Sequence, residues 1–139
     1  MANALDIQRG AARVLIDADH AVLRELPLAN GRRADLVAVD HAGGITVVEI
    51  KSCRADFMCD RKWQGYLDYC DRFYFAVDSD FPRNILPADE GLILADRFEG
   101  AIVREARLRR LGAARRKAML VRFARASASR LQILADPTF

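Results

Sequence analysis

The sequence predicts a single α/β domain in which helices cover both faces of a mixed sheet. One observation is the order of the expected elements: a helix, three strands, a helix and a strand, then a hairpin and a basic helix. A second is that the strands expected near 36–39 and 45–50 are apolar on both faces, as in sheets covered on both sides. A third is the strand–helix–strand unit over residues 45–77, whose crossover predicts two parallel strands. The length of 139 residues fits one domain, 1–139.

Composition narrows the class of protein. Apolar residues make up 52% of the chain and charged residues 29%, which is typical of a folded globular protein. No apolar run is long enough to cross a membrane, and the N-terminus lacks the pattern of a signal peptide, so we expect a cytoplasmic protein. The three cysteines form no Cys-x-x-Cys pair, which predicts free thiols and no zinc site.

Positive charge is concentrated in the last third of the chain. Residues 97–130 hold 11 Lys and Arg against 2 Asp and Glu, a net charge of +9, and the remaining residues carry −6. This asymmetry predicts a polyanionic partner, because guanidinium groups bind phosphate in a bidentate way. The alternative is a solvated helix face that happens to be rich in arginine.

The elements follow from local patterns. An apolar stripe predicts the first helix over 5–18, and a proline ends the strand predicted over 21–27. Residues 55–71 place apolar side chains on one side of a second helix, and the aromatic run 73–77 predicts a strand. A hairpin is expected from 91–95 and 101–104. The last helix is predicted over 112–135, with a core stripe of Leu120, Phe123, Ala124, Ser127, Leu131 and Leu134.

Two carboxylates and an amine are expected to meet at one end of the hairpin formed by residues 32–51. Glu49 and Lys51 share one face of a strand, because residues two apart point to the same side. Asp35 on the preceding strand joins them only if the connection has the right register, since a slip of one residue reverses the face.

The turn therefore decides whether the cluster forms. A three-residue loop over 42–44, a five-residue loop from Asp40 to Gly44, or a bulge would bring Asp35 beside Glu49. A four-residue loop that pairs Leu36 with Glu49 would separate the two carboxylates. Because glycine adopts the positive φ that such turns require, the pair at 43–44 favours an arrangement that forms the cluster.

This set of side chains is suited to phosphodiester hydrolysis. Hard cations such as Mg²⁺ or Mn²⁺ prefer oxygen ligands, here Asp35, Glu49 and the carbonyl of Ile50. Lys51 would lie beside the water or the scissile phosphate, where it could orient the nucleophile or stabilise developing charge. On spacing alone, the competing interpretation is a salt bridge at the end of the strand, between Glu49 and Lys51 or with a neighbouring residue.

Several short motifs carry a resemblance to known proteins. The arrangement of Asp35 with Glu49-Ile50-Lys51 resembles the PD-(D/E)XK nuclease superfamily. Over nearly the whole chain, the sequence is similar to the MmcB-like DNA-repair family, and the motifs that carry this likeness are 25–28, 31–35, 48–52, 56–57, 60–63 and 70–77. The resemblance implies a restriction-endonuclease-like core of αβββαβ order, a DNA-repair role and a nuclease-type site.

The resemblance also assigns roles to residues. Asp35 and Glu49 match metal ligands of the superfamily, Lys51 its catalytic lysine, and Glu25 an additional upstream acid. Further residues are expected to contact DNA: Lys62 and Gln64 on the helix after the lysine, Arg32 and Arg33 beside Asp35, and Arg115, Arg122 and Arg125 on the basic helix.

Three functions remain open from the sequence. The leading one is a Mg²⁺- or Mn²⁺-dependent deoxyribonuclease in DNA repair. The second is an inactive nuclease fold that binds DNA or a repair partner; since the chain holds no separate specificity domain, a partner or a homodimer would assist it. The third is a phosphohydrolase of small molecules, which the basic helix and the lack of a glycine-rich phosphate loop disfavour.

Overall fold

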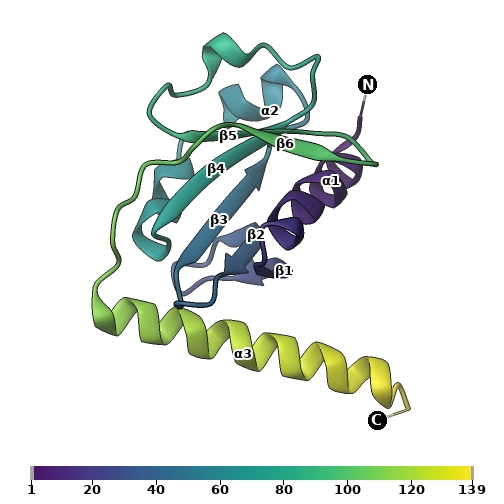
Figure 1. The fold of residues 1–139 in the computed structure, drawn as a ribbon, viewed down its shortest axis with the longest axis vertical. Helices are drawn as coiled ribbons and strands as arrows, with labels where there is room; N and C mark the ends of the chain where they lie inside the picture. Colours follow the sequence, from purple (N-terminus) through teal and green to yellow (C-terminus); the bar gives the residue numbers. More distant parts are fainter. Residues whose placement is uncertain (1, 139) are drawn as a thin grey trace.

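The computed structural model describes residues 2–138 and is organised around a six-stranded sheet with strand order β1-β2-β3-β4-β5-β6 (Figure 1). β3 pairs in parallel with β4 and β4 with β5, whereas the other neighbours are antiparallel. The predicted mixed sheet and the parallel crossover are thus confirmed. The strands are β1 (Ala21–Pro27), β2 (Arg33–Val39), β3 (Ile45–Ile50), β4 (Arg72–Val77), β5 (Gly91–Ala95) and β6 (Gly100–Arg104).

Helices cover both faces of the sheet. The helices are α1 (Ala4–Asp17), α2 (Arg54–Cys59), η1 (Trp63–Tyr69), η2 (Arg83–Ile85) and α3 (Ala113–Ala135), of which η1 and η2 are 3-10 helices. α1 packs on one face, where Ile7, Ala11 and Leu15 are buried against Val48 and Ile93. Among residues 2–138, no helix has both the length and the apolar character needed to cross a membrane.

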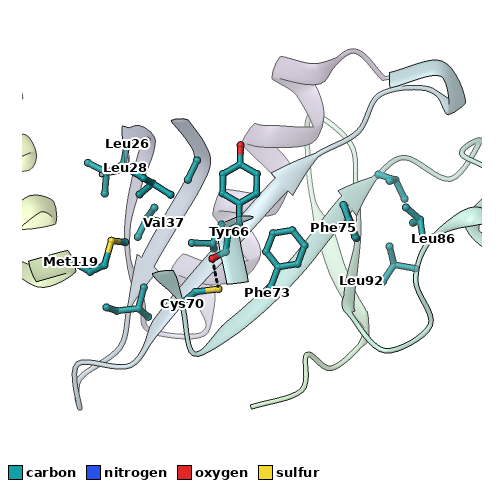
Figure 2. Close-up of a cluster of buried hydrophobic side chains, with 14 of the residues drawn as sticks. Leu26, Leu28, Val37, Tyr66, Cys70, Phe73, Phe75, Leu86, Leu92 and Met119 are labelled. Carbon is teal, nitrogen blue, oxygen red and sulfur yellow. Dashed lines mark hydrogen bonds between the residues drawn. The ribbon is translucent and has the colours of Figure 1, made fainter. Parts of the chain in front are cut away.

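The opposite face carries the larger core, which α2, η1 and α3 cover. Figure 2 shows this cluster, in which Tyr66 and Phe73 stack with ring centroids 6.0 Å apart. Trp63 stacks on Phe73 and meets Phe75 edge-on, at centroid distances of 5.6 and 5.2 Å. Trp63 therefore packs as a core residue, because its ring contacts buried aromatic rings.

Asp71 connects three segments that are distant in the sequence. Its carboxylate accepts hydrogen bonds from the backbone nitrogens of Ile45 and Leu111, at 2.8 and 2.9 Å. The Arg116 guanidinium donates two further bonds to it, at 2.6 and 2.7 Å. Burial alone would raise the pKa of Asp71, but these hydrogen bonds, led by that from Arg116, lower it to about 2. Asp71 thereby joins the start of β3 to the segment before α3 and to α3 itself.

Arginines of α3 also reach the backbone of β1, the strand at one edge of the sheet. Arg130 donates to the carbonyls of Arg24 and Glu25, and Arg122 donates to the carbonyl of Pro27 at 3.3 Å. Three backbone carbonyls of the edge strand therefore accept hydrogen bonds from α3.

The core stripe predicted for α3 is wrong in part. Leu120, Phe123 and Ser127 are half-buried, but Ala124, Leu131 and Leu134 are exposed, and Met119 is the residue of α3 that is fully buried. Because Arg116 and Arg130 bind polar groups of the sheet, the packed side of the helix includes these two arginines. The far end of α3 extends past the sheet (Figure 1).

Candidate functional site

The connection between β2 and β3 brings the two predicted carboxylates together. Val39 pairs with Ile45 and Leu36 with Val48, so the loop contains the five residues 40–44. This register places Asp35 opposite Glu49. Of the arrangements that the sequence allowed, the five-residue loop is the one that forms.

Asp40 builds that loop. Its carboxylate accepts hydrogen bonds from the backbone nitrogens of Ala42 and Gly44, at 2.9 and 2.7 Å. Gly43 has a φ of +83°, a conformation that glycine adopts without strain. An aspartate at the start of the turn and a glycine at its tip thus fix the register on which the site depends.

The half-buried Asp35 and the buried Glu49 form an acid pair. The Asp35 carboxylate accepts a hydrogen bond from the backbone nitrogen of Ile50 at 2.7 Å, where the ladder between β2 and β3 ends. Glu49 is only 7% exposed. Burial, followed by the hydrogen bond to Asp35 and the negative charge of Asp35, raises the pKa of Glu49 to about 9. This shift favours the protonated form of Glu49 near neutral pH.

Lys51 lies at the end of the same strand and is 5% exposed. Its ammonium donates to Asp60 at 2.9 Å, and the other oxygen of Asp60 lies 3.5 Å from the Arg32 guanidinium. Burial would raise the pKa of Asp60, but hydrogen bonds from Lys51 and from the backbone of Lys62 lower it. Lys51 also lowers the pKa of Glu49 through its positive charge, so the ammonium acts on the acid pair as well. The competing interpretation of a salt bridge at the end of the strand is thus met in part, because Lys51 forms an ion pair with its neighbour Asp60 rather than with Glu49.

The helix predicted over 55–71 is divided in two. α2 ends at Cys59 and η1 begins at Trp63. Asp60 lies in the break, and its carboxylate accepts a hydrogen bond from the backbone nitrogen of Lys62 at 3.0 Å. Because the same carboxylate binds Lys51, the chain turns at Asp60 rather than continuing as a helix.

Two further residues of the site were missed from the sequence. Tyr66 on η1 donates its hydroxyl to the carbonyl of Arg33 at 3.1 Å and is hydrogen-bonded to Glu49, while the Arg32 guanidinium lies 5.0 Å from its ring centroid. Burial, followed by the charge of Glu49 and that hydrogen bond, raises the pKa of Tyr66. The apolar spacing of the segment predicts Tyr66 as a core residue. Its phenol oxygen, which needs a hydrogen-bond partner when buried, was the signal that could have placed it in the site.

Gln8 is the second. It is buried on α1, and its amide donates to the carbonyl of Asp35 at 3.2 Å and accepts from Arg24 at 3.4 Å. A polar residue beside Ile7 on the packed side of the first helix was the signal that could have revealed it. Gln8 ties α1 to the strand that carries Asp35.

The other predicted site residues lie farther from the acid pair. Glu25, with φ of +52°, has a 54% exposed side chain whose carboxylate is 3.9 Å from the Arg33 guanidinium. Among residues 2–138, the Glu25 side chain forms no hydrogen bond with Asp35 or Glu49. Lys62 and Gln64 are exposed beside the break in the helix.

The basic residues predicted on α3 differ in their surroundings. Arg115 donates to the carbonyl of Asp68 at 3.0 Å and lies 4.7 Å from the Tyr69 ring centroid. Arg122 reaches Pro27, as described above, whereas Arg125 is exposed. Part of the basic charge of this segment therefore serves to attach α3 to the sheet.

The cluster offers the type of oxygen donor that a hard divalent cation prefers. Within the described residues, no three Asp, Glu, His or Cys side chains lie together as a metal-binding group. Asp35 and Glu49 supply two carboxylates, and the Ile50 carbonyl is adjacent in the chain. Burial and the neighbouring charge of Asp35 raise the pKa of Glu49, so added positive charge at this pair would be favourable.

Comparison with known proteins gives two matches. A family model described as DNA repair protein MmcB-like matches residues 1–138. The solved structure of a protein of unknown function from Silicibacter pomeroyi is 43% identical, with a TM-score of 0.94 over 99% of this chain and 94% of that chain. No curated protein matches the sequence.

Proposed function

The chain belongs to the MmcB-like family of DNA repair proteins, and on this premise we propose that it hydrolyses phosphodiester bonds of DNA at the Asp35–Glu49–Lys51 cluster with Mg²⁺ or Mn²⁺. The observation that carries the proposal is the pair of Asp35 and the buried Glu49 with the ammonium of Lys51 beside it, at the end of two adjacent strands. A restriction-endonuclease-like core and the PD-(D/E)XK assignment are part of the same proposal.

Asp35, Glu49 and the Ile50 carbonyl would hold the cation. When bound, the cation lowers the pKa of a water molecule and offsets the charge of the phosphate. Lys51 supplies a positive charge toward the phosphate, and Asp60 holds its ammonium in one direction. Arg32, which is tied to Asp60 and stacked on Tyr66, is placed to contact a neighbouring phosphate.

A second candidate function is recognition of DNA or of a repair partner without cleavage. The feature that favours it is the pairing of Lys51 with Asp60, which satisfies the ammonium within the protein. A further feature is the raised pKa of Glu49, which favours the protonated acid over the carboxylate that a cation would need. Binding of a divalent cation distinguishes the two functions, because a recognition module has no need of it.

The contact between Lys51 and Asp60 gives a prediction about stability. Replacing Asp60 by asparagine leaves the buried ammonium without a charged partner, and we expect unfolding free energy to fall by about 2–4 kcal/mol. Asp56→Asn is the matched control, because the Asp56 carboxylate is exposed and accepts one hydrogen bond from the backbone of Ser52 at 3.2 Å. Urea unfolding of both variants measures the difference. Equal stability of the two variants would show that Asp60 does not hold Lys51.

Glu49→Gln tests the metal site without disturbing the fold. Glutamine resembles the protonated form of Glu49 in shape and charge, so the unfolding free energy near neutral pH should be unchanged or higher. Titration calorimetry with Mn²⁺ should give binding to the wild type and at least about tenfold weaker binding to the variant. Equal Mn²⁺ affinity of the two proteins would place the cation elsewhere.

Cleavage itself is tested on several forms of DNA. The substrates are plasmid, single-stranded, flap and branched DNA, each incubated with Mg²⁺ or Mn²⁺ and with a chelator. We expect cleavage of at least one form that the chelator stops. If Mn²⁺ does not bind and none of the four forms is cut, the recognition function is favoured, and salt-dependent DNA affinity would then identify DNA as its partner.

A further inference from the structure

Lys51 and Arg32 share one anion, the carboxylate of Asp60. One oxygen of Asp60 lies 2.9 Å from the Lys51 ammonium, and the other lies 3.5 Å from the Arg32 guanidinium. The pKa of Asp60 is below its ordinary value, so the side chain carries a negative charge at neutral pH. Because lysine and arginine also bind the two non-bridging oxygens of a phosphodiester, the place between these two cations suits a phosphate as well as a carboxylate.

Each of the two cations is held in position without Asp60. The backbone nitrogen of Lys51 donates to the carbonyl of Ala76 on β4 at 3.0 Å, and the Lys51 side chain is only 6% exposed. The Arg32 guanidinium lies 5.0 Å from the ring centroid of Tyr66, which is buried. The place between the two cations would therefore persist if Asp60 moved away.

The segment that carries Asp60 is attached to the rest of the fold by few contacts. α2, which precedes it, has no buried residue; its half-buried side chain is Phe57, which meets the Phe75 ring edge-on at a centroid distance of 5.6 Å. Arg61 and Lys62, which follow Asp60, are exposed. Outward movement of Asp60 thus uncovers little apolar surface, and its cost is mainly the loss of the two ion contacts.

From these observations we propose that Asp60 is an internal substitute for a phosphate of DNA, and that a bound DNA strand displaces it from Lys51 and Arg32. The incoming phosphate contacts both cations, and Asp60 moves outward at the break between α2 and η1. The inference rests on the proposed function in one respect, that DNA binds at this cluster, and it does not require cleavage. In the free chain Asp60 lowers the affinity for DNA, because only molecules in which the place is vacant can accept the phosphate.

A fixed Asp60 would oppose DNA binding. A phosphate that approached Lys51 or Arg32 would meet the negative charge of Asp60 beside the same cations, and most of the attraction would be cancelled. The contacts of Asp60 also differ from those of Asp71, which accepts hydrogen bonds from backbone nitrogens of distant segments. The backbone hydrogen bond of Asp60 is local, from Lys62, and its partners from other elements are the two cations.

DNA affinity in the absence of divalent cations tests the displacement. Fluorescence anisotropy of a labelled oligonucleotide, single-stranded or as a duplex, is measured with a chelator at about 0.15 M salt, so that cleavage plays no part. We expect Asp60→Asn to bind at least one of the two forms at least about fivefold more tightly than the wild type does. Circular dichroism checks that the variant is folded.

Asp56→Asn is the matched control for this gain. It removes one negative charge from the same part of the chain, and the exposed Asp56 carboxylate contacts only the backbone of Ser52. Its DNA affinity should differ from that of the wild type by less than about twofold, because exposed charges are screened at this salt concentration. An equal gain for Asp56→Asn and Asp60→Asn would overturn the proposal, as would equal affinity of Asp60→Asn and the wild type.

Lys51 decides whether the gain comes from the vacated place. In a Lys51→Ala background, Asp60→Asn should improve DNA affinity by less than about twofold, because the ammonium that receives the phosphate is missing. A gain that persists in full without Lys51 would assign the effect to general charge and overturn the proposal.

The wild type supplies a test that does not depend on the folding of any variant. A crystal structure with a short DNA strand should show a phosphate oxygen in contact with Lys51 Nζ and Asp60 turned away from it. A complex in which Asp60 still contacts Lys51 would overturn the proposal, and so would the absence of DNA binding by every variant. Tighter binding by Asp60→Asn together with no cleavage of any form of DNA would support this inference and refute hydrolysis alone.

Discussion

Replacing Asp35 by asparagine is expected to lower the rate of metal-dependent DNA cleavage by at least about a hundredfold while the protein stays folded. The Asp35 carboxylate accepts the backbone hydrogen bond of Ile50, and the amide oxygen of asparagine can still accept it. What the variant loses is the negative charge that, in the proposed function, would hold a cation together with Glu49. Initial rates on the cleaved form of DNA, measured at saturating Mg²⁺, give the change in activity, and thermal unfolding confirms that the fold is intact.

Two further variants make that result specific. Lys51→Ala should lower the rate to a similar extent, because it removes the positive charge beside the acid pair. Asp56→Ala removes an acid from the neighbouring helix α2 and should leave the rate unchanged, since Asp56 is exposed and lies outside the cluster. Cleavage that survives both Asp35→Asn and Lys51→Ala would eliminate this cluster as the catalytic site.

Replacing Asp71 by alanine is expected to lower the unfolding free energy by about 3–5 kcal/mol. The change leaves the Arg116 guanidinium without its partner and removes the acceptor for the backbone nitrogens of Ile45 and Leu111. Asp68→Ala, at an exposed aspartate nearby, should change stability by no more than about 0.5 kcal/mol. Denaturant unfolding followed by circular dichroism measures both, and equal stability of the two variants would contradict the role assigned to Asp71.

The same residue predicts how stability depends on acid. The pKa of Asp71 is about 2 in the folded protein and 3.8 for an ordinary aspartate, so its contribution is complete above about pH 4. As the pH falls from about 4 toward 2, the folded state loses this contribution, because Asp71 must accept a proton and release Arg116. Asp71→Ala should therefore lose less stability than the wild type over this pH range.

Local patterns in the sequence were sufficient to predict most of the sheet. β1 and β5 begin and end at the predicted residues, because a proline or a glycine marks their limits. The sequence predicted that Asp35 and Glu49 would meet only for certain lengths of the turn between their strands. This condition arises because side chains alternate along a strand, so the pairing register decides which face each carboxylate occupies. The length of the loop is set by the hydrogen bonds that the Asp40 carboxylate accepts, and the sequence alone did not single out this length.

Features that depend on partners distant in the sequence were not predictable in the same way. The break at Asp60 exists because Lys51, on another element, binds its carboxylate. The side of α3 that packs on the sheet is set by Arg116 and Arg130. Arg116 binds Asp71, and Arg130 binds the backbone of β1. Helical periodicity counts arginine as a residue of the solvent face, so a helix that packs through guanidinium groups is assigned the wrong side.

The arginines that reach β1 have a consequence for aggregation. A sheet whose last strand keeps free carbonyls and amide groups can be extended by a strand of another molecule, which is how fibrils and misassembled oligomers grow. In this chain Arg122 and Arg130 occupy carbonyls along that strand and place positive charge there. Loss of α3, by proteolysis or truncation, would therefore leave carbonyls of β1 without partners and open to pairing with a strand of another molecule. We expect the shortened protein to aggregate.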